Sequence, residues 1–401
     1  MEGADKMYLT KEEEKTLAGE HGEVLERMLR LLVRLGDIYE ADKMVPVGSV
    51  QVAGVSYKSI EDPGMEFLED LAKKGARVKV VTFLNPAGMD MDDWKAMGIP
   101  KAFAEKQTRI MDAFGKMGIV TSATCTPYLA GNLPRYREHI AWSESSAIAF
   151  SNSVIGARTN REGGPSALAA ALCGVTPHYG LHLDVNRKPD FLIDVKAELK
   201  SSADYGALGY HVGKIVRNKN PYFVGLPESD TDKLKALGAA MAASGAVAMY
   251  HVKDQTPEAH LWETAGLEKV EIGQKELEET YAKLNTGKVA DIVILGCPHA
   301  SLREITELAE KLKGRKVKKQ LWICTSRMTK DCAARMGLVH TIEKAGGKVV
   351  ADTCMVVSPI EDMGYQTTGV NSGKAANYLP GFCKQSVMFK SVDDLVKEVT
   401  E

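Results

Sequence analysis

The segment Asp291-Ile292-Val293-Ile294-Leu295-Gly296-Cys297-Pro298-His299 carries the pattern that decides the fold. A run of apolar residues that ends at a glycine predicts a buried strand over 291–295 followed by a turn. The next apolar stripe, 302–312, has helical spacing, and a strand, a helix and a strand are then predicted over 320–324, 330–345 and 348–351. Strands that alternate with helices through short connections are typical of a parallel, doubly wound sheet with helices on both faces.

The same alternation continues, less regularly, toward the N-terminus. Thr10-Lys11-Glu12-Glu13 fits a capping box that opens an amphipathic helix reaching Leu35. Beyond it the pattern predicts strands over 49–55, 78–83 and 118–122 and helices over 65–74, 101–116, 145–154, 165–173, 234–243 and 275–283. We therefore predict a multi-domain α/β protein. An N-terminal region, 1–285, carries Cys125 and the central loop 156–164, and a C-terminal domain, 286–401, carries Cys297 and Cys354.

Length and composition are those of an ordinary globular protein. With about 100 to 200 residues per domain, 401 residues predict two to four domains. Lys plus Arg is 51 against Asp plus Glu 53, so there is no basic excess and nucleic acid is not an expected partner. No apolar run approaches the roughly 20 residues that span a bilayer, and the polar N-terminus lacks a signal-peptide pattern. We expect a cytoplasmic protein with no membrane partner, whose seven cysteines form no disulfide framework.

Three of the cysteines follow predicted strands: Cys125, Cys297 and Cys354. Ligands of parallel α/β sheets bind at the carboxyl ends of strands. Three thiolates from such loops could hold a four-iron four-sulfur cluster by three of its irons and leave the fourth iron open. Spacing alone leaves open the alternative that these are ordinary buried thiols in a metal-free scaffold. The remaining cysteines fit structural roles better, because they lie on predicted helices, on helix flanks or in an apolar strand: Cys173, Cys324, Cys332 and Cys383.

Polar residues in other loops and at a helix start could bind a small anionic substrate. Backbone amides, hydroxyls and cations in such places bind carboxylate and phosphate groups. The candidates are Gly54, Val55, Ser56 and Lys58 after the first strand, Asn85 and Pro86 after the second, Glu144 and Ser145 at a helix start, Arg158 in the central loop, and Lys374. Ser145 could instead be a helix cap, and Arg158 could pair with neighbouring acids. His299 could orient a cluster ligand, meet the substrate or cap backbone.

Several of these segments, taken in order, form a recognisable set of motifs. They are Gly75–Val78 with Thr82–Asn85, Thr124–Tyr128, Glu144–Ala147, Gly156–Gly164, Gly296–His299, Asp352–Cys354 and, more loosely, Lys374–Tyr378. Together they resemble the large subunit of the aconitase X family over nearly the whole chain. The resemblance implies an aconitase-like fold and an iron-sulfur hydro-lyase whose cluster falls on Cys125, Cys297 and Cys354.

The resemblance also implies a partner. The family contains a small swivelling domain, fused or as a separate subunit, and this chain has no further β-rich segment of the right size. A separate small subunit is therefore expected, forming a heterodimer or a larger assembly. By analogy with aconitases it would bring the catalytic base, so no catalytic base is expected in this chain.

The turn Ala53-Gly54-Val55-Ser56-Tyr57-Lys58 separates two branches of that family. Members that dehydrate cis-3-hydroxyproline typically carry an acid, a thiol and an imidazole there, and all three are absent here. The turn looks like that of the archaeal branch, which implies dehydration of (R)-5-phosphomevalonate to trans-anhydromevalonate 5-phosphate in a mevalonate pathway of isoprenoid biosynthesis. Lys58 adds a cation suited to a phosphorylated hydroxy acid. The alternatives are a cis-3-hydroxyproline dehydratase and a non-catalytic iron-sulfur sensor, whose RNA-binding form is disfavoured by the near-neutral charge.

Overall fold

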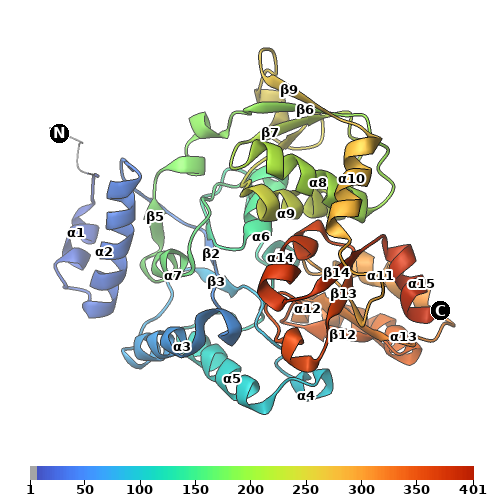
Figure 1. Ribbon diagram of the computed structural model, residues 1–401. Helices are drawn as coiled ribbons and strands as arrows, with labels where there is room; N and C mark the ends of the chain where they lie inside the picture. Colours follow the sequence, from blue (N-terminus) through green and yellow to red (C-terminus); the bar gives the residue numbers. More distant parts are fainter. Residues whose placement is uncertain (1–6) are drawn as a thin grey trace.

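The computed structural model describes residues 7–401 (Figure 1). The first unit is built on a three-stranded parallel sheet in the order β3-β2-β4. Its strands are β2 (Ser49–Val52), β3 (Val81–Leu84) and β4 (Ala141–Trp142), and its helices are α3 (Tyr57–Lys73), α4 (Trp94–Met97), α5 (Lys101–Lys116), α6 (Ser145–Phe150) and α7 (Gly164–Cys173). Leu68 of α3, Phe114 of α5 and Leu168 of α7 join Val50 of β2 in one buried apolar cluster. The apolar faces of these helices therefore hold the sheet between them.

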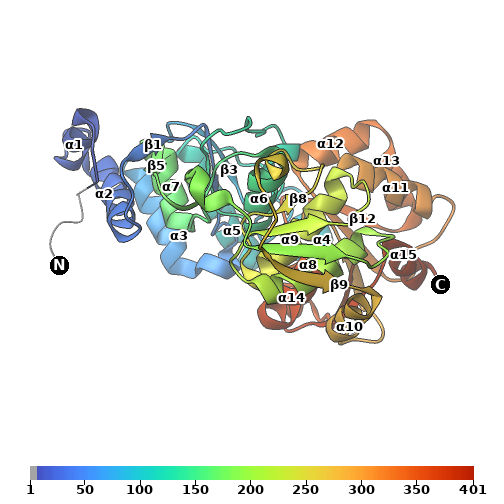
Figure 2. The same ribbon diagram turned by 90° about the horizontal axis from the view of Figure 1, so that it is seen from above.

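Two N-terminal helices lie beside this unit, at one end of the molecule (Figure 2). Helix α1 (Lys11–Leu17) begins at the predicted capping box, with the Thr10 side chain accepting the amide of Glu13. The single helix predicted as far as Leu35 is wrong, because the chain turns over 18–22 before α2 (Glu23–Ile38) begins. Strand β1 (Met44–Pro46) then pairs antiparallel with β5 (Val175–Pro177).

The second unit holds a four-stranded parallel sheet in the order β8-β7-β6-β9. Its strands are β6 (Phe191–Val195), β7 (Pro221–Val224), β8 (His251–Val252) and β9 (Glu268–Ile272), and its helices are α8 (Ser202–Val216), α9 (Thr231–Gly245) and α10 (Gln274–Leu284). Only α9 and α10 were predicted here. The region 1–285 thus contains two separate parallel sheets in addition to the β1-β5 pair.

The third unit contains the five-stranded sheet β12-β11-β10-β13-β14, in which every pairing is parallel. Its strands are β10 (Ile292–Leu295), β11 (Gln320–Thr325), β12 (Lys348–Ala351), β13 (Thr367–Val370) and β14 (Ser386–Phe389), and its helices are α11 (Leu302–Leu312), α12 (Arg327–Arg335), α13 (Leu338–Ala345), α14 (Gly373–Cys383) and α15 (Val392–Thr400). The predicted doubly wound parallel sheet is confirmed. The single helix predicted over 330–345 is wrong, because Gly337 takes a φ of 75° and separates α12 from α13.

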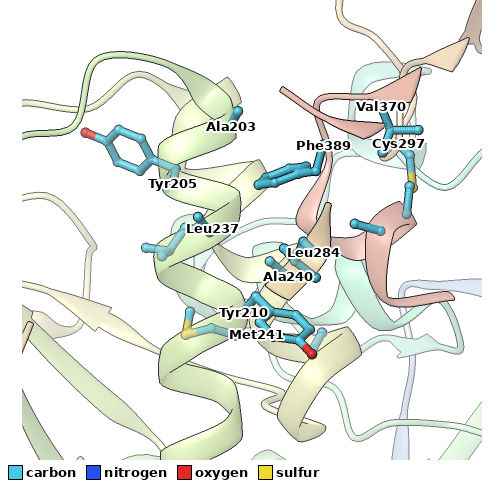
Figure 3. Packing of buried hydrophobic residues seen from close by; sticks show 14 of the residues in the cluster. Ala203, Tyr205, Tyr210, Leu237, Ala240, Met241, Leu284, Cys297, Val370 and Phe389 are labelled. Atoms are coloured by element: carbon cyan, nitrogen blue, oxygen red, sulfur yellow. The ribbon is translucent and has the colours of Figure 1, made fainter. Parts of the chain in front are cut away.

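One apolar core joins the second unit to the third. Phe389 at the end of β14 belongs to the same buried cluster as Ala203 of α8 and Leu284 of α10, and Cys297 and Val370 lie at the edge of this core (Figure 3). Packing of the two units therefore supports the loop that carries Cys297. Within residues 7–401, no helix combines the length and the apolar character needed to cross a membrane.

Candidate functional site

The carboxyl ends of the first and third sheets carry the residues predicted for the site. In the first sheet β2 ends before the turn 53–56, and its neighbours β3 and β4 end before Asn85 and Glu144. In the third sheet β10 and β13 are neighbours at the point where the strand order reverses. Cys297 follows β10, and Lys374 follows β13. Such a switch point opens a crevice above a parallel sheet and is the usual place for a ligand.

The structure brings Cys125, Cys297 and Cys354 together. Burial raises the pKa of the Cys125 thiol well above its ordinary value, and the other two cysteines add to the rise. Burial and Cys297 likewise raise the pKa of Cys354 to about 12. Thiols that raise one another's pKa lie close together. Within residues 7–401, no set of three or more His, Cys, Asp or Glu side chains is spaced for a single metal ion. The three thiols are the candidate ligands of this site.

His299 ties the three cysteine loops to one another. Its Nε2 lies 2.8 Å from the carbonyl oxygen of Thr353, its Nδ1 2.9 Å from the hydroxyl of Thr124, and its backbone N–H donates to Cys125 Sγ at 3.1 Å. Because a carbonyl oxygen only accepts, Nε2 carries the proton and Nδ1 accepts from the hydroxyl. Burial lowers the pKa of His299 to about 4, so the ring is neutral at pH 7. Both ring nitrogens are occupied, and of the three roles left open for His299 the contacts favour orientation of the cysteine loops.

A buried ion pair lies beside the thiols. Lys374 at the start of α14 pairs with Glu144 at the start of α6, and its Nζ also lies 3.1 Å from Ser146 Oγ. Burial alone would raise the pKa of Glu144, but Lys374 and then the Ser146 amide and the Asn85 side chain lower it. Burial alone would lower the pKa of Lys374, but Glu144, Cys297 and Cys125 raise it. Both groups are therefore charged at neutral pH, and the pair joins the first unit to the third.

The turn after β2 contacts the loop that follows Cys354. The Ser56 hydroxyl donates to the carbonyl oxygen of Val357, three residues after Cys354, at 2.8 Å. Ser56 also caps α3 by accepting the amide of Lys58 at 3.2 Å. Asn85 Oδ1 is buried and has no hydrogen-bond partner within residues 7–401. An unpaired buried acceptor is costly, so Asn85 Oδ1 is available to accept a hydrogen bond from a ligand, while its amide group contacts Glu144.

Lys58 already has partners in the structure. Its ammonium lies 2.7 Å from a Glu361 carboxylate oxygen, 3.2 Å from the Ser358 carbonyl oxygen and 3.4 Å from Cys383 Sγ. These contacts join the start of α3 to the third unit. Lys58 thus lies next to the turn 53–56, as the sequence requires, but its charge is balanced by a carboxylate.

Arg158 is placed in a different cluster. Its guanidinium lies 2.5 Å from Glu258 Oε1 and 2.8 Å from Asp184 Oδ1, and Arg187 lies 2.9 Å from the same Glu258 carboxylate. Burial alone would raise the pKa of Glu258, but Arg187 and Arg158 lower it. These contacts are those of the alternative interpretation, pairing with neighbouring acids, and among the described residues no contact favours the expected role of Arg158 as a substrate anchor.

Glu258→Gln should destabilise the protein strongly. The change leaves the buried guanidinium of Arg187 without its carboxylate, and breaking a buried pair in this way costs about 3–5 kcal/mol. Urea unfolding followed by circular dichroism should show the midpoint falling. Glu198→Gln removes a pair with Lys200 in which both side chains are more than 70% exposed, 74% and 73%, and it should change little. Equal midpoints for the two variants would contradict a structural role for the cluster.

Two residues near the site, Ser146 and Asp352, were not predicted from the sequence. Ser146 bonds both members of the Glu144–Lys374 pair, although only Ser145 was predicted to bind. Asp352 accepts the amide of Ala123 at 3.1 Å through its side chain and the amide of Ala87 at 2.7 Å through its backbone oxygen. An acid two residues before Cys354 in a turn is a signal that could have suggested this role.

The comparisons with known proteins agree over nearly the full length. Models of the first, second and third domains of aconitase X match residues 6–185, 189–282 and 290–401. The phosphomevalonate dehydratase large subunit of Methanocaldococcus jannaschii is 57% identical, over 98% of this chain and 100% of that protein. The cis-3-hydroxy-L-proline dehydratase of Hypocrea jecorina is 32% identical over 94% of this chain, which covers 66% of that protein.

A solved structure extends the match to three dimensions. The crystal structure of Thermococcus kodakaraensis aconitase X in its holo form aligns with a TM-score of 0.93 at 49% identity, and the alignment covers 98% of this chain and 100% of that chain. The expected aconitase-like α/β architecture is confirmed by this match. Since the three domain models also follow one another in order along the sequence, the chain belongs to the aconitase X family.

Proposed function

We propose that this chain is the large subunit of a hydro-lyase that converts (R)-5-phosphomevalonate to trans-anhydromevalonate 5-phosphate. The observation that carries the proposal is the end-to-end match, at 57% identity, to a phosphomevalonate dehydratase large subunit. The match to a hydroxyproline dehydratase is weaker, at 32%, and this chain covers only 66% of that protein. The turn 53–58, which carries a lysine and lacks the acid, thiol and imidazole of the hydroxyproline branch, supports the same choice.

We assign Cys125, Cys297 and Cys354 as ligands of a four-iron four-sulfur cluster. When bound by three thiolates, such a cluster keeps one iron open, which supplies Lewis-acid chemistry at a substrate hydroxyl. The donor set fits this group: Cys297 and Cys354 follow β10 and β12, and Cys125 lies two residues after Ala123, which forms an isolated bridge with Leu84 of β3. The His299 amide already donates to the Cys125 sulfur. Hydrogen bonds to sulfur are among the interactions that tune such centres.

Residues of this chain would bind and orient the substrate. Lys374, beside the thiols, can donate to the substrate carboxylate, and Asn85 Oδ1 can accept from a substrate hydroxyl. Glu144 holds the Lys374 ammonium in place, with the Ser146 hydroxyl bonded to both and the Ser145 hydroxyl 3.4 Å from Glu144. The turn Gly54-Val55-Ser56 before α3, with Pro86 in the neighbouring loop, would contact the substrate phosphate.

Loss of water also requires removal of the proton α to the carboxylate. Glu144 is a poor base, because Lys374 holds its pKa below the ordinary value. We propose that the base comes from a small subunit, as the name "large subunit" implies for the relatives. The longer hydroxyproline dehydratase, of which this chain covers 66%, has room for such a part within one chain.

The test is reconstitution under anaerobic conditions with the small subunit and a supply of iron and sulfide. The assembled enzyme should dehydrate 5-phosphomevalonate, with the product identified by NMR. Unphosphorylated mevalonate lacks the charge-assisted contacts to phosphate, each worth roughly 1.5 to 3 kcal/mol, so its kcat/KM should be at least about ten- to a hundredfold lower. Cis-3-hydroxy-L-proline should be turned over negligibly.

The isolated large chain is the matched control for the partner. It should bind the cluster and yet show negligible dehydration, because the base would be missing. Substantial turnover by the isolated chain would overturn the assignment of the base to the small subunit. A higher kcat/KM for cis-3-hydroxy-L-proline than for 5-phosphomevalonate would overturn the choice of substrate.

A further inference from the structure

We propose that Gln107, a buried glutamine of α5, is a positioning residue that holds the two substrate-binding turns in register. Its Nε2 donates to the carbonyl oxygen of Val55 at 2.9 Å. Its Oε1 accepts the amides of Tyr57 at 3.1 Å and Gly88 at 2.9 Å. One side chain therefore spans the turn after β2 and the turn after β3. The proposal rests on the proposed function, which assigns both turns to the substrate.

The place of Gln107 in its helix indicates that the amide has a specific role. Helix α5 turns Ala104, Ile110, Met111 and Phe114 inward, and Gln107 lies among these buried positions with no exposed surface. A polar group in such a position is unfavourable unless its hydrogen bonds are made. The three bonds of Gln107 all go to the two turns, so the turns are what explains an amide here rather than an apolar side chain.

The two turns also touch directly at the point that Gln107 bridges. A Cβ added to Gly88 would lie 2.7 Å from Ser56 Oγ and 2.3 Å from the ring of Phe103. Only a glycine allows this approach, since real Cβ atoms are not found so close to other atoms. The spacing between Ser56 and the Asn85–Gly88 loop is thus set by a tight contact on one side and by the Gln107 bonds on the other.

The loops that carry Cys125, Cys297 and Cys354 are held together by His299. His299 bonds the neighbours of Cys125 and Cys354, whereas the three hydrogen bonds of Gln107 go to Val55, Tyr57 and Gly88. Loss of the Gln107 bonds should therefore disturb the binding of the substrate and leave the cluster in place. A change of this kind raises KM without a matching fall in kcat.

Gln107→Met tests the proposal, because methionine has a similar length and makes none of the three bonds. In the reconstituted enzyme KM should rise about tenfold, kcat should fall less than about threefold, and iron content and visible absorbance should match the wild type. Thr108→Val is the matched control on the same helix: the Thr108 hydroxyl donates only to the Ala104 carbonyl oxygen, and its removal should leave KM unchanged. Unchanged KM in Gln107→Met, or a loss of kcat and cluster with KM preserved, would overturn the proposal.

Gly88→Ala gives an independent measurement in case the methionine variant folds poorly. It retains Gln107 and puts a methyl group against Ser56 Oγ and the Phe103 ring, so the contact between the two turns must shift. The same rise in KM with intact cluster absorbance is expected, and its absence would count against the proposal. KM is compared on the substrate that the wild type uses best. An enzyme that prefers cis-3-hydroxy-L-proline would therefore refute the proposed function and still decide the role of Gln107.

Discussion

Cys125→Ser, Cys297→Ser and Cys354→Ser should each abolish dehydration and remove the visible absorbance of the anaerobically purified protein. Each replaces one of the three thiols that the fold brings together. Serine offers an oxygen where an iron-sulfur centre is held by thiolate, and the site then has two sulfur ligands in place of three. Because the metal is expected to supply several kcal/mol of transition-state stabilisation, turnover should fall by on the order of a thousandfold or more.

The other cysteines supply matched controls. Cys173 is half-buried on α7 and Cys332 is exposed on α12, so their alanine variants should keep the spectrum and the activity. Cys324→Ala is the sharpest control: this buried thiol of β11 is close enough to the three proposed ligands that they raise its pKa. Cys383→Ala is a less strict control, because the Cys383 thiol donates to the carbonyl oxygens of Met355 and Val356, next to Cys354. It should still keep the cluster, since it alters none of the three proposed ligands. Full iron content in one of the three serine variants would remove that residue from the ligand set.

Lys374→Met should cost about a hundred- to a thousandfold in kcat/KM while the cluster remains. The change removes the ammonium proposed to bind the substrate carboxylate, a charge-assisted contact worth roughly 1.5 to 3 kcal/mol. It also leaves Glu144, which is only 8% exposed, without its counter-charge beside the thiols. Negative charge at that place opposes the approach of an anionic substrate, so the loss should exceed that of one contact.

The kcat/KM and iron content of Lys374→Met are compared with those of Lys397→Met, which removes an exposed lysine of α15 in the same unit. The control should match the wild type. Lys374→Arg should restore little, because the planar guanidinium is larger than the ammonium that fits between Glu144 and Ser146. Activity of Lys374→Met within about threefold of the wild type would contradict the assignment.

The sequence predicted three of the five strands of the third sheet, missing β13 and β14, and none of the strands of the second sheet. Strands β10, β11 and β12 follow their predictions to within one residue at either end, because each is a short apolar run between helices of regular spacing. Strand β9 was not predicted because Glu268–Ile272 is charged and largely exposed along its length, so it lacks the apolar pattern that indicates a strand. Its place is decided by pairing with β6, a contact that no local pattern reveals.

What the sequence by itself determined is the position of each candidate residue along its own segment: a cysteine after a strand, a lysine at a helix start, a polar turn before a helix. These are local properties, carried by spacing and turn chemistry within about ten residues. Only the tertiary structure decided which of these segments meet. Glu144 pairs with Lys374, 230 residues away in the sequence, whereas Arg158 pairs with Glu258, 100 residues away. The physical reason is that a buried charge needs a counter-charge, and the packing of the units, not the spacing along the chain, selects it.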